Sequence, residues 1–299
     1  MSTSADAPQA GDPGNVAVVT DSTTYLPPEL IQSRGIEQVS LYVGWAGDHR
    51  PEQEYDLDEF YARLRDSDEL PSTSQPSVGD FLARYEPLAE AGRDIVSIHI
   101  ASGLSGTYES AREAARVIED KGHRGRVEVV DGQTGAGGLG CMVLGAAEAA
   151  AQGQTLEQVA AAARRTREGL EMWFCLDTLE YLRRGGRIGA AQALVGSALK
   201  IKPILTFGSE IVPVGRVRTK KRALERMVAY LHELHERGAS GWIVQHAQLP
   251  GDAAALVAEG EAIFGSEPIF CTQVGAVLGA HLGSGFLVGG IGCAPPADA

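Results

Sequence analysis

The chain has 299 residues, of which 44% are hydrophobic and 22% are charged, and this composition predicts a globular protein with a substantial core. Its formal net charge of −13 at pH 7 argues against nucleic acid as the main partner. The longest apolar stretch, Leu139–Ala151, contains Glu148 and is too short to span a bilayer, so we expect a protein that is not embedded in a membrane.

The first fifteen residues are rich in Ser, Ala, Pro, Gly and Asp, and they lack the basic start and apolar core of a signal peptide. We therefore expect residues 1–15 to form a disordered tail. The four cysteines, Cys141, Cys175, Cys271 and Cys293, lie far apart and form no Cys-x-x-Cys pair. This usage is typical of a reduced compartment, so we expect a cytoplasmic protein without a metal site.

The N-terminal half alternates apolar runs with helical segments. Four runs predict buried strands of a parallel sheet: Val16–Thr20, Val39–Val43, Asp94–Ala101 and Val127–Val130. The helical segments between them imply right-handed βαβ units. Because ligands bind beyond the carboxyl ends of such strands, we expect the loops after Thr20, Ala101 and Val130 to open on one crevice.

The pattern loosens after about Gln152. Helices are predicted over residues 156–167, 176–184 and 219–237, and apolar runs over residues 172–175, 201–207, 242–245 and 269–274. We predict a two-domain α/β protein, with an N-terminal parallel-sheet domain at residues 16–165 and a smaller C-terminal α/β domain with a mixed sheet at 166–295. We leave open that one domain is discontinuous.

Several motifs favour structural roles. The G-x-G-x-x-G pattern at residues 135–140 follows a strand and opens a helix, as in dinucleotide-binding proteins, but no acidic strand end follows it. A close-packed helix start is the better interpretation. His232 and His235 stand among charged residues on one helix, which predicts a solvated face, and His99 lies inside an apolar run, which predicts a core histidine.

Other segments carry hydroxyl groups at helix starts. Thr73–Ser77 predicts a helix N-cap entered through a proline, and Ser102 and Ser105 precede a helix whose free N–H groups can bind an anion. His281 lies in a glycine-rich segment that predicts a flexible turn. Between Arg164 and Arg226 the chain has 14 basic and 6 acidic residues, so this segment is a candidate docking face or an ordinary solvated surface.

Six sequence blocks resemble the DegV family, which includes the fatty-acid-binding subunits (FakB) of bacterial fatty acid kinase. They occur in the family's order and extend over nearly the whole chain from Val16: Thr20–Thr23, Thr73–Ser77, Ser102–Tyr108, Gly186–Gly189, Val217–Arg222 and Ala280–Gly285. The resemblance implies a DegV-like fold that holds a long-chain fatty acid between its domains. A separate, ATP-dependent kinase subunit phosphorylates the bound carboxylate in such systems. This chain would then carry the lipid without catalysis of its own, with no cofactor, in phospholipid precursor metabolism.

The resemblance also implies individual residue roles. Thr73, Ser105 and His281, with Ser102 close by, match the contacts of the carboxylate. Arg187 matches an arginine that works with the kinase subunit, and we expect the neighbouring Arg183 and Arg184 to face the same partner. The alternative for Arg187 is a structural role at helix carbonyls. Ser284 replaces a proline that many relatives have. Transient contact with a membrane surface stays open.

Two physical expectations accompany this assignment. Neutral donors hold a carboxylate more lightly than an arginine fork, which suits a group that must attack a phosphoryl donor. This is our hypothesis for why no Arg or Lys occurs in the carboxylate-binding loops. The competing function is a serine-type acyl hydrolase, because Gly103–Thr107 resembles a nucleophile elbow whose Ser105 would use His281. His246 is a second candidate histidine for that enzyme.

Overall fold

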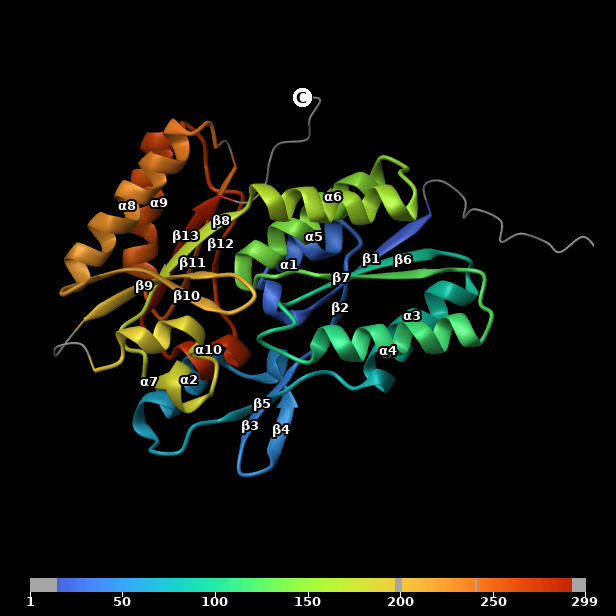
Figure 1. Ribbon diagram of the computed structural model, residues 1–299, viewed down its shortest axis with the longest axis horizontal. Helices are drawn as coiled ribbons and strands as arrows, with labels where there is room; N and C mark the ends of the chain where they lie inside the picture. The colour runs from blue at the N-terminus through green and yellow to red at the C-terminus, as the bar shows by residue number, and fades with distance from the viewer. Residues whose placement is uncertain (1–14, 197–200, 240, 292–299) are drawn as a thin grey trace, which may run out of the picture.

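The computed structural model describes residues 15–196, 201–239 and 241–291, whose strands form three sheets (Figure 1). Of the predicted tail, only Asn15 belongs to these ranges, and its carbonyl accepts a hydrogen bond from the Asp94 N–H. Cys293 and the predicted domain end at residue 295 lie outside them. Within these ranges, no helix combines the length and hydropathy that crossing a bilayer requires.

The N-terminal sheet is entirely parallel, as predicted, with the strand order β2-β1-β6-β7. Its strands are β1 (Val16–Asp21), β2 (Glu37–Val39), β6 (Asp94–His99) and β7 (Val127–Asp131). Alternate residues of β1 enter different cores, since Val16 and Val18 face one side of the sheet, and Ala17 and Val19 face the other. Both faces are therefore buried, which explains the continuous apolar runs.

Helices cover the two faces of this sheet (Figure 1). The helices of this half are α1 (Pro28–Ser33), α3 (Val78–Glu90), α4 (Thr107–Asp120), α5 (Ala136–Ala151) and α6 (Leu156–Gly169), with the 3₁₀ turn η1 (Ser22–Thr24). Helices α3 and α4 pack on one face, and α5 and α6 on the other. The predicted N-cap before α3 is present, because Ser77 and Asp80 form a capping box.

A small antiparallel sheet, which the sequence reading missed, lies apart from the parallel one. It has the order β4-β3-β5 and consists of β3 (Tyr42–Trp45), β4 (Asp48–Pro51) and β5 (Ser72–Ser74), with η2 (Glu52–Glu54) and helix α2 (Leu57–Asp66) between β4 and β5. The predicted strand Val39–Val43 was wrong, because its residues divide between β2 and β3. The β3–β4 turn is Ala46-Gly47, both at positive φ, which fits a type I′ hairpin without the usual Asn-Gly signal.

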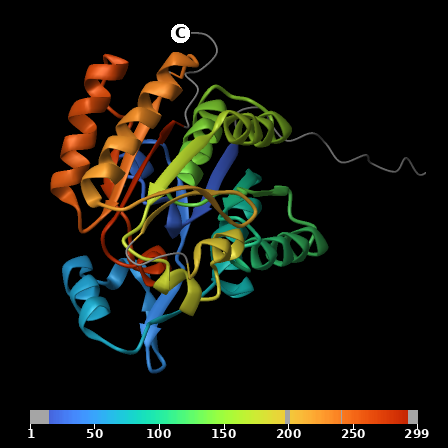
Figure 2. The ribbon, with the colours of Figure 1, turned by 60° about the vertical axis from the view of Figure 1, so that its left-hand side comes forward.

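The C-terminal sheet is mixed, as predicted, with the order β10-β9-β8-β13-β11-β12. Its strands are β8 (Glu171–Cys175), β9 (Lys202–Phe207), β10 (Ile211–Val217), β11 (Trp242–Ala247), β12 (Cys271–Gln273) and β13 (Phe286–Ile291). Only the β11–β12 pair is parallel. Helices α8 (Lys220–Glu236) and α9 (Pro250–Phe264) cover one face of this sheet (Figure 2). The fold class is thus confirmed.

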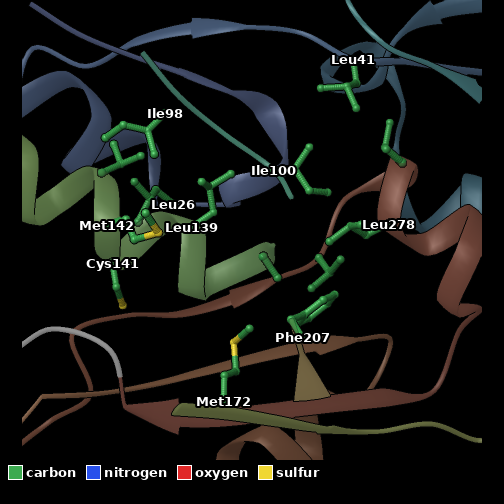
Figure 3. Packing of buried hydrophobic residues seen from close by; sticks show 14 of the residues in the cluster. Leu26, Leu41, Ile98, Ile100, Leu139, Cys141, Met142, Met172, Phe207 and Leu278 are labelled. Carbon is green, nitrogen blue, oxygen red and sulfur yellow. The ribbon is translucent and has the colours of Figure 1, made fainter. Parts of the chain in front are cut away.

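The other face of the C-terminal sheet shares a core with the N-terminal half. Helix α5 lies between the two sheets, and a methyl group on Gly137 would come within 2.3 Å of Ile243 in β11. This contact supports the interpretation of the 135–140 glycines as a close-packed helix start. Figure 3 shows the shared core, where α5, which carries Leu139, Cys141 and Met142, lies between Ile98 of β6 and Met172 of β8.

Three short elements complete the structure near the small sheet: α7 (Glu180–Arg184), η3 (Gly189–Leu194) and α10 (Ala276–Leu282). The predicted helix over 176–184 is therefore shorter than expected, because Leu176 continues the backbone pairing of β8 by donating to the Pro203 carbonyl. Helix α10 packs against α2, α7, β3 and β5. Since it lies between β12 and β13 in the chain, α10 links the small sheet to the C-terminal sheet.

Candidate ligand-binding pocket

A pocket opens where the three sheets meet. With its mouth, it holds about 570 Å³ of space free of protein atoms. Its apolar lining comes from every part of the fold: Leu41, Ile100, Leu104, Leu182, Phe207, Ile211, Val277, Leu278 and Leu282. Most of these side chains also belong to the large core between the sheets. The pocket is therefore continuous with the main core rather than a surface depression.

The inner wall of the pocket can be followed in Figure 3. Ile100, Phe207 and Leu278 come from the N-terminal half, β9 and α10, and they lie near one another in the core. Beyond them the apolar surroundings continue to Met172 and Leu139. A flexible hydrocarbon chain entering the pocket would meet the apolar side chains of Ile100, Phe207 and Leu278 at this wall.

The polar lining lies among residues predicted to bind a carboxylate. Thr73 in β5, Ser105 before α4 and His281 in α10 all line the pocket, although 208 residues separate Thr73 from His281. The Thr73 Oγ1 and His281 Nε2 atoms are 2.8 Å apart. The Ser105 Oγ is 2.8 Å from the Thr107 Oγ1 at the start of α4. The structure thus brings three distant predicted residues to one pocket.

His281 is neutral at physiological pH. Burial, together with the positive charge of Arg187, lowers the pKa of its imidazole to about 4. Its Nδ1 is buried without a hydrogen-bond partner among the described residues. We therefore assign the proton to Nε2, where it is donated to Thr73, since the other tautomer would bury an unpaired N–H. In this arrangement the Thr73 hydroxyl hydrogen is free to point into the pocket.

His281 does not lie in a flexible turn, so that prediction was wrong. It stands in the last turn of α10, which ends at Gly283 with φ +79°. Two glycines pack tightly around this turn: a methyl group on Gly185 would lie 2.5 Å from the His281 Nδ1, and one on Gly283 would lie 2.4 Å from the Tyr181 ring. The glycines thus allow close backbone packing around His281 instead of flexibility.

Ser102 does not line the pocket. Its hydroxyl donates to Asp131 Oδ2 at 2.6 Å and its N–H to Asp131 Oδ1 at 3.1 Å. Asp131 ends β7, so this pair ties the loop that carries Ser105 to the edge of the parallel sheet. Of the three loops expected at the crevice, the one after Ala101 supplies Leu104 and Ser105, whereas the loops after Thr20 and Val130 supply no lining residue.

The three arginines predicted to face a partner are exposed, and each hydrogen-bonds within the chain. Arg187 lines the pocket and donates to the carbonyl oxygens of Gly185 at 2.8 Å and Leu104 at 3.4 Å. Arg183 pairs with Glu180, and Arg184 donates to the Asp68 carbonyl. The segments that carry Thr73, Ser105 and His281 contain no Arg or Lys, and Arg187 reaches the pocket from its own loop, which folds against that of Ser105.

The comparisons with known proteins identify the family of this chain. The model of the family described as "Uncharacterised protein, DegV family" matches residues 15–292. The chain belongs to the DegV family. It is 36% identical to Protein DegV of Bacillus subtilis over 277 residues, covering 91% of this chain and 97% of that protein. It is 39% identical to a DegV domain-containing protein of Streptomyces coelicolor, with coverages of 91% and 96%.

Solved structures of DegV proteins are also similar. A Thermus thermophilus DegV family protein, described by its fatty acid binding, superposes with a TM-score of 0.83 at 35% identity, covering 93% of this chain and 99% of that one. The DegV of Bacillus subtilis, described as a fatty acid binding protein, has a TM-score of 0.83 at 34% identity, with coverages of 93% and 99%. The DegV fold is shared over nearly the full length of both.

The sequence reading of this DegV protein missed Gln75 and most of the apolar wall. Gln75 lines the pocket and packs against the loop of Ser105, since a methyl group on Gly106 would come within 2.5 Å of the Gln75 amide nitrogen. Its place within the Thr73–Ser77 block was the available signal. Leu41, Phe207 and Ile211 had none, because each looks like any other core residue in the sequence.

The geometry does not favour the hydrolase alternative. The Ser105 hydroxyl pairs with Thr107 and the His281 Nε2 with Thr73, so the predicted nucleophile and base each have another partner. The second candidate, His246, accepts from the Leu249 N–H and is absent from the pocket lining. A nucleophile and a base in mutual contact are what acyl-transfer chemistry requires.

The remaining histidines lie away from the pocket in the part of the chain that the structure describes. No cluster of His, Cys, Asp and Glu there has the arrangement of a metal site. His232 and His235 lie on α8, and His235 packs edge-on against Phe264. His99 is fully buried with both ring nitrogens bonded, so its interpretation as a core histidine is confirmed.

Proposed function

We propose that this DegV protein binds a long-chain fatty acid in the pocket and presents its carboxylate to a separate kinase subunit for conversion to an acyl phosphate. One observation carries the binding half of this proposal: Thr73, Ser105 and His281 converge on a pocket whose remaining lining is largely apolar. The DegV proteins of Thermus thermophilus and Bacillus subtilis, described as binding fatty acids, support it.

The apolar lining provides the driving force. Burying each methylene group contributes about 0.8 kcal/mol, so a long acyl chain contributes on the order of 10 kcal/mol before the entropy costs of binding. Met172 and Leu139 belong to the buried core that continues beyond Phe207. Unbranched methionine side chains adapt readily to the shape of a flexible chain.

The head group needs hydrogen-bond donors, because an unpaired buried carboxylate costs several kcal/mol. In the tautomer assigned here, Thr73 donates its hydroxyl to one carboxylate oxygen, and Ser105 can turn its hydroxyl from Thr107 to the other. Arg187 adds a positive charge nearby while its guanidinium stays on backbone carbonyls. The carboxylate is then bound without a bidentate arginine and keeps a lone pair for attack on a phosphoryl donor.

Ser102 supports this site from behind in our proposal. Its two hydrogen bonds to Asp131 hold the loop that carries Ser105. We therefore assign Ser102 a positioning role, with direct contact to the carboxylate only when its hydroxyl leaves Asp131.

Organic extraction of purified protein followed by mass spectrometry tests the binding half. We expect a stoichiometric long-chain fatty acid from the native chain and a much reduced amount from Thr73→Ala and His281→Ala. Full retention of lipid by both variants, or no lipid in native protein and none taken up on incubation with fatty acid, would refute it. Steady ester hydrolysis without retained lipid would instead support the hydrolase.

Arg187→Ala tests the presentation half. All three arginines are exposed, and Arg187 also lines the pocket, so a partner reaching the carboxylate would meet Arg187. We expect the variant to bind fatty acid at nearly the native affinity and to lose turnover with an ATP-dependent kinase subunit. Equal losses of lipid binding and thermal stability would point to the structural role at Gly185 and Leu104 instead. Arg216→Ala, also exposed but on β10, is the matched control.

A further inference from the structure

A second polar cluster lies behind the pocket wall, around Glu52 of η2. Glu52 is only 4% exposed, yet its carboxylate accepts three hydrogen bonds. Ser22 donates to Oε1, while the Tyr25 hydroxyl and the Val277 N–H reach Oε2 at 3.1 and 3.0 Å. The donors come from η1 with its C-cap Tyr25 and from α10, so one carboxylate in η2 joins two segments that are distant in the sequence.

This cluster caps the helix that carries His281. The N-cap of α10 is Gly275, which has no side chain to bind the free N–H groups of the first turn. Glu52 binds the Val277 N–H, and the Tyr25 hydroxyl binds the Leu278 N–H at 3.1 Å. A methyl group on Gly275 would lie 2.4 Å from the Tyr25 ring, so glycine is what lets the cap come so close.

The same cluster holds the opposite wall of the pocket. The Ser22 Oγ accepts the Leu41 N–H at 3.0 Å, and the Glu52 N–H donates to the Leu41 carbonyl at 3.0 Å. Leu41 lines the pocket, as do Val277 and Leu278. Glu52 is thus hydrogen-bonded, directly or through Ser22 and Tyr25, to the backbone of all three of these lining residues.

We propose that Glu52 is a positioning residue for the ligand: its carboxylate fixes the first turn of α10 against Leu41 and so sets the shape of the pocket and the place of His281. This inference rests on the proposed fatty acid binding. Glu52 does not line the pocket and does not contact the ligand. It acts on the ligand only through the lining residues that its hydrogen bonds hold in place.

The charge of Glu52 changes near neutral pH. Burial, opposed by its three hydrogen bonds and assisted by the negative charge of Asp21, raises its pKa to about 7. The titratable groups facing it are Asp21, Tyr25 and Tyr61, and the pKa values of both tyrosines lie above their ordinary range. A second cavity, lined by Ser22, Tyr25 and Glu52 among others, borders the cluster on its far side and gives protons access.

The test compares Glu52→Gln with Glu54→Gln, which removes an exposed carboxylate from the same 3₁₀ turn. The measurement is the dissociation rate of a fluorescent long-chain fatty acid from each protein, between about pH 5.5 and 8.5. At the highest pH, where the native carboxylate is charged, we expect the fatty acid to dissociate about tenfold faster from Glu52→Gln than from the native protein. The ratio should fall toward about twofold at the low end, where the native Glu52 is itself protonated.

This ratio separates positioning from a general loss of structure. Ionisation of the fatty acid itself affects both proteins equally and cancels, whereas a loss of fold would raise dissociation at every pH. Glu54→Gln should match the native protein throughout. Equal native and Glu52→Gln rates at high pH, or a ratio that does not change with pH, would overturn the inference.

Tyr25→Phe is the second variant, in case Glu52→Gln does not fold. It removes the hydroxyl between Glu52 and the Leu278 N–H but keeps the carboxylate, so dissociation should rise severalfold while its pH dependence remains. Hydrogen exchange of residues 275–282 in lipid-free protein gives a readout that needs no ligand. If native protein binds no fatty acid, the proposed function fails, and native-like exchange in Glu52→Gln would then refute the positioning role separately.

Discussion

His99 and His281 each have a hydroxyl side chain next to the ring Nε2, but His99 lies inside the core and His281 lines the pocket. His99 lies in β6 between Asp21, 3.2 Å from its Nδ1, and Ser97, 2.7 Å from its Nε2, with the Tyr85 hydroxyl 2.6 Å beyond Ser97. His281 has a threonine on Nε2, nothing on the buried Nδ1 among the described residues, and a pocket beside it. Asp21 and His99 are both fully buried.

The contrast shows that a chain of Asp, His and Ser does not make a site by itself. The His99 chain satisfies its polar groups internally and has no space for a reactant, so it holds the parallel sheet together. The His281 arrangement keeps unused hydrogen-bonding capacity at the edge of an apolar space. Disrupting the His99 chain should therefore lower the stability of the fold, and disrupting the His281 arrangement should weaken ligand binding.

Asp21→Ala should have the largest effect on folding. Asp21 accepts hydrogen bonds from the N–H groups of Thr23 and Ile100, at 3.0 and 2.9 Å, as well as from the His99 ring. Losing this acceptor leaves several buried donors unpaired, so we expect about 3 to 5 kcal/mol of destabilisation in urea unfolding. Asp48→Ala, on the exposed strand β4, should cost less than about 0.5 kcal/mol. Equal costs would remove the contrast.

The pH dependence of stability should distinguish His281 from an ordinary histidine. Its folded pKa, about 4, lies below its ordinary value of 6.5, so between these values the unfolded chain binds more protons. The free energy of unfolding should therefore fall as the pH drops from about 6.5 to 4, by up to about 3 kcal/mol from this residue. His281→Gln should lack that loss when urea midpoints are compared at each pH.

Glu52 changes the free energy of unfolding with pH in the opposite direction to His281. Its folded pKa, about 7, lies above the ordinary value of 4.5, so the folded protein binds more protons in that range. Its contribution to the free energy of unfolding therefore falls as the pH rises from about 4.5 to 7. The two contributions partly cancel in the native protein, and only the single variants, each compared with the native chain, reveal them. Parallel curves for either variant and the native chain would contradict that residue's sign.

Thr73→Ala and Ser105→Ala should weaken fatty acid binding with little effect on stability. A hydrogen bond to a charged group contributes about 1.5 to 3 kcal/mol, so each loss should weaken binding about 10- to 100-fold. Displacement of a fluorescent fatty acid measures the affinity, and urea unfolding checks the fold. Ser72→Ala, which changes the exposed residue before Thr73 in β5 and does not touch the pocket lining, is the control. Native affinity in both variants would show that the carboxylate lies elsewhere.

Ser102→Ala should have the smallest effect. It removes one hydrogen bond to Asp131, about 1 kcal/mol, and leaves the Ser102 N–H bond in place. Affinity should fall only severalfold, through a looser Ser105 loop. A loss as large as that of Ser105→Ala would instead indicate direct contact between Ser102 and the carboxylate, and would make the two hydroxyls equivalent.

Much of the fold followed from local patterns. The strands near Val16, Asp94 and Val127 and the long helix α8 were predicted from apolar runs and helical spacing. The small sheet was missed because β4 and β5 are short and polar, and because the β3–β4 turn is Ala46-Gly47 instead of Asn-Gly. Such strands are stabilised by partners distant in sequence, so their own residues carry little signal.

The candidate site was likewise only partly predictable from local sequence. Local sequence blocks and their resemblance to the DegV family pointed to Thr73, Ser105 and His281. The tertiary structure alone decided that these residues share a pocket, that Ser102 binds Asp131, that Arg187 reaches the pocket, and that Glu52 caps α10. The physical reason is that periodicity and capping depend on neighbours in the chain, whereas burial, protonation and hydrogen-bond partners depend on groups brought together by packing.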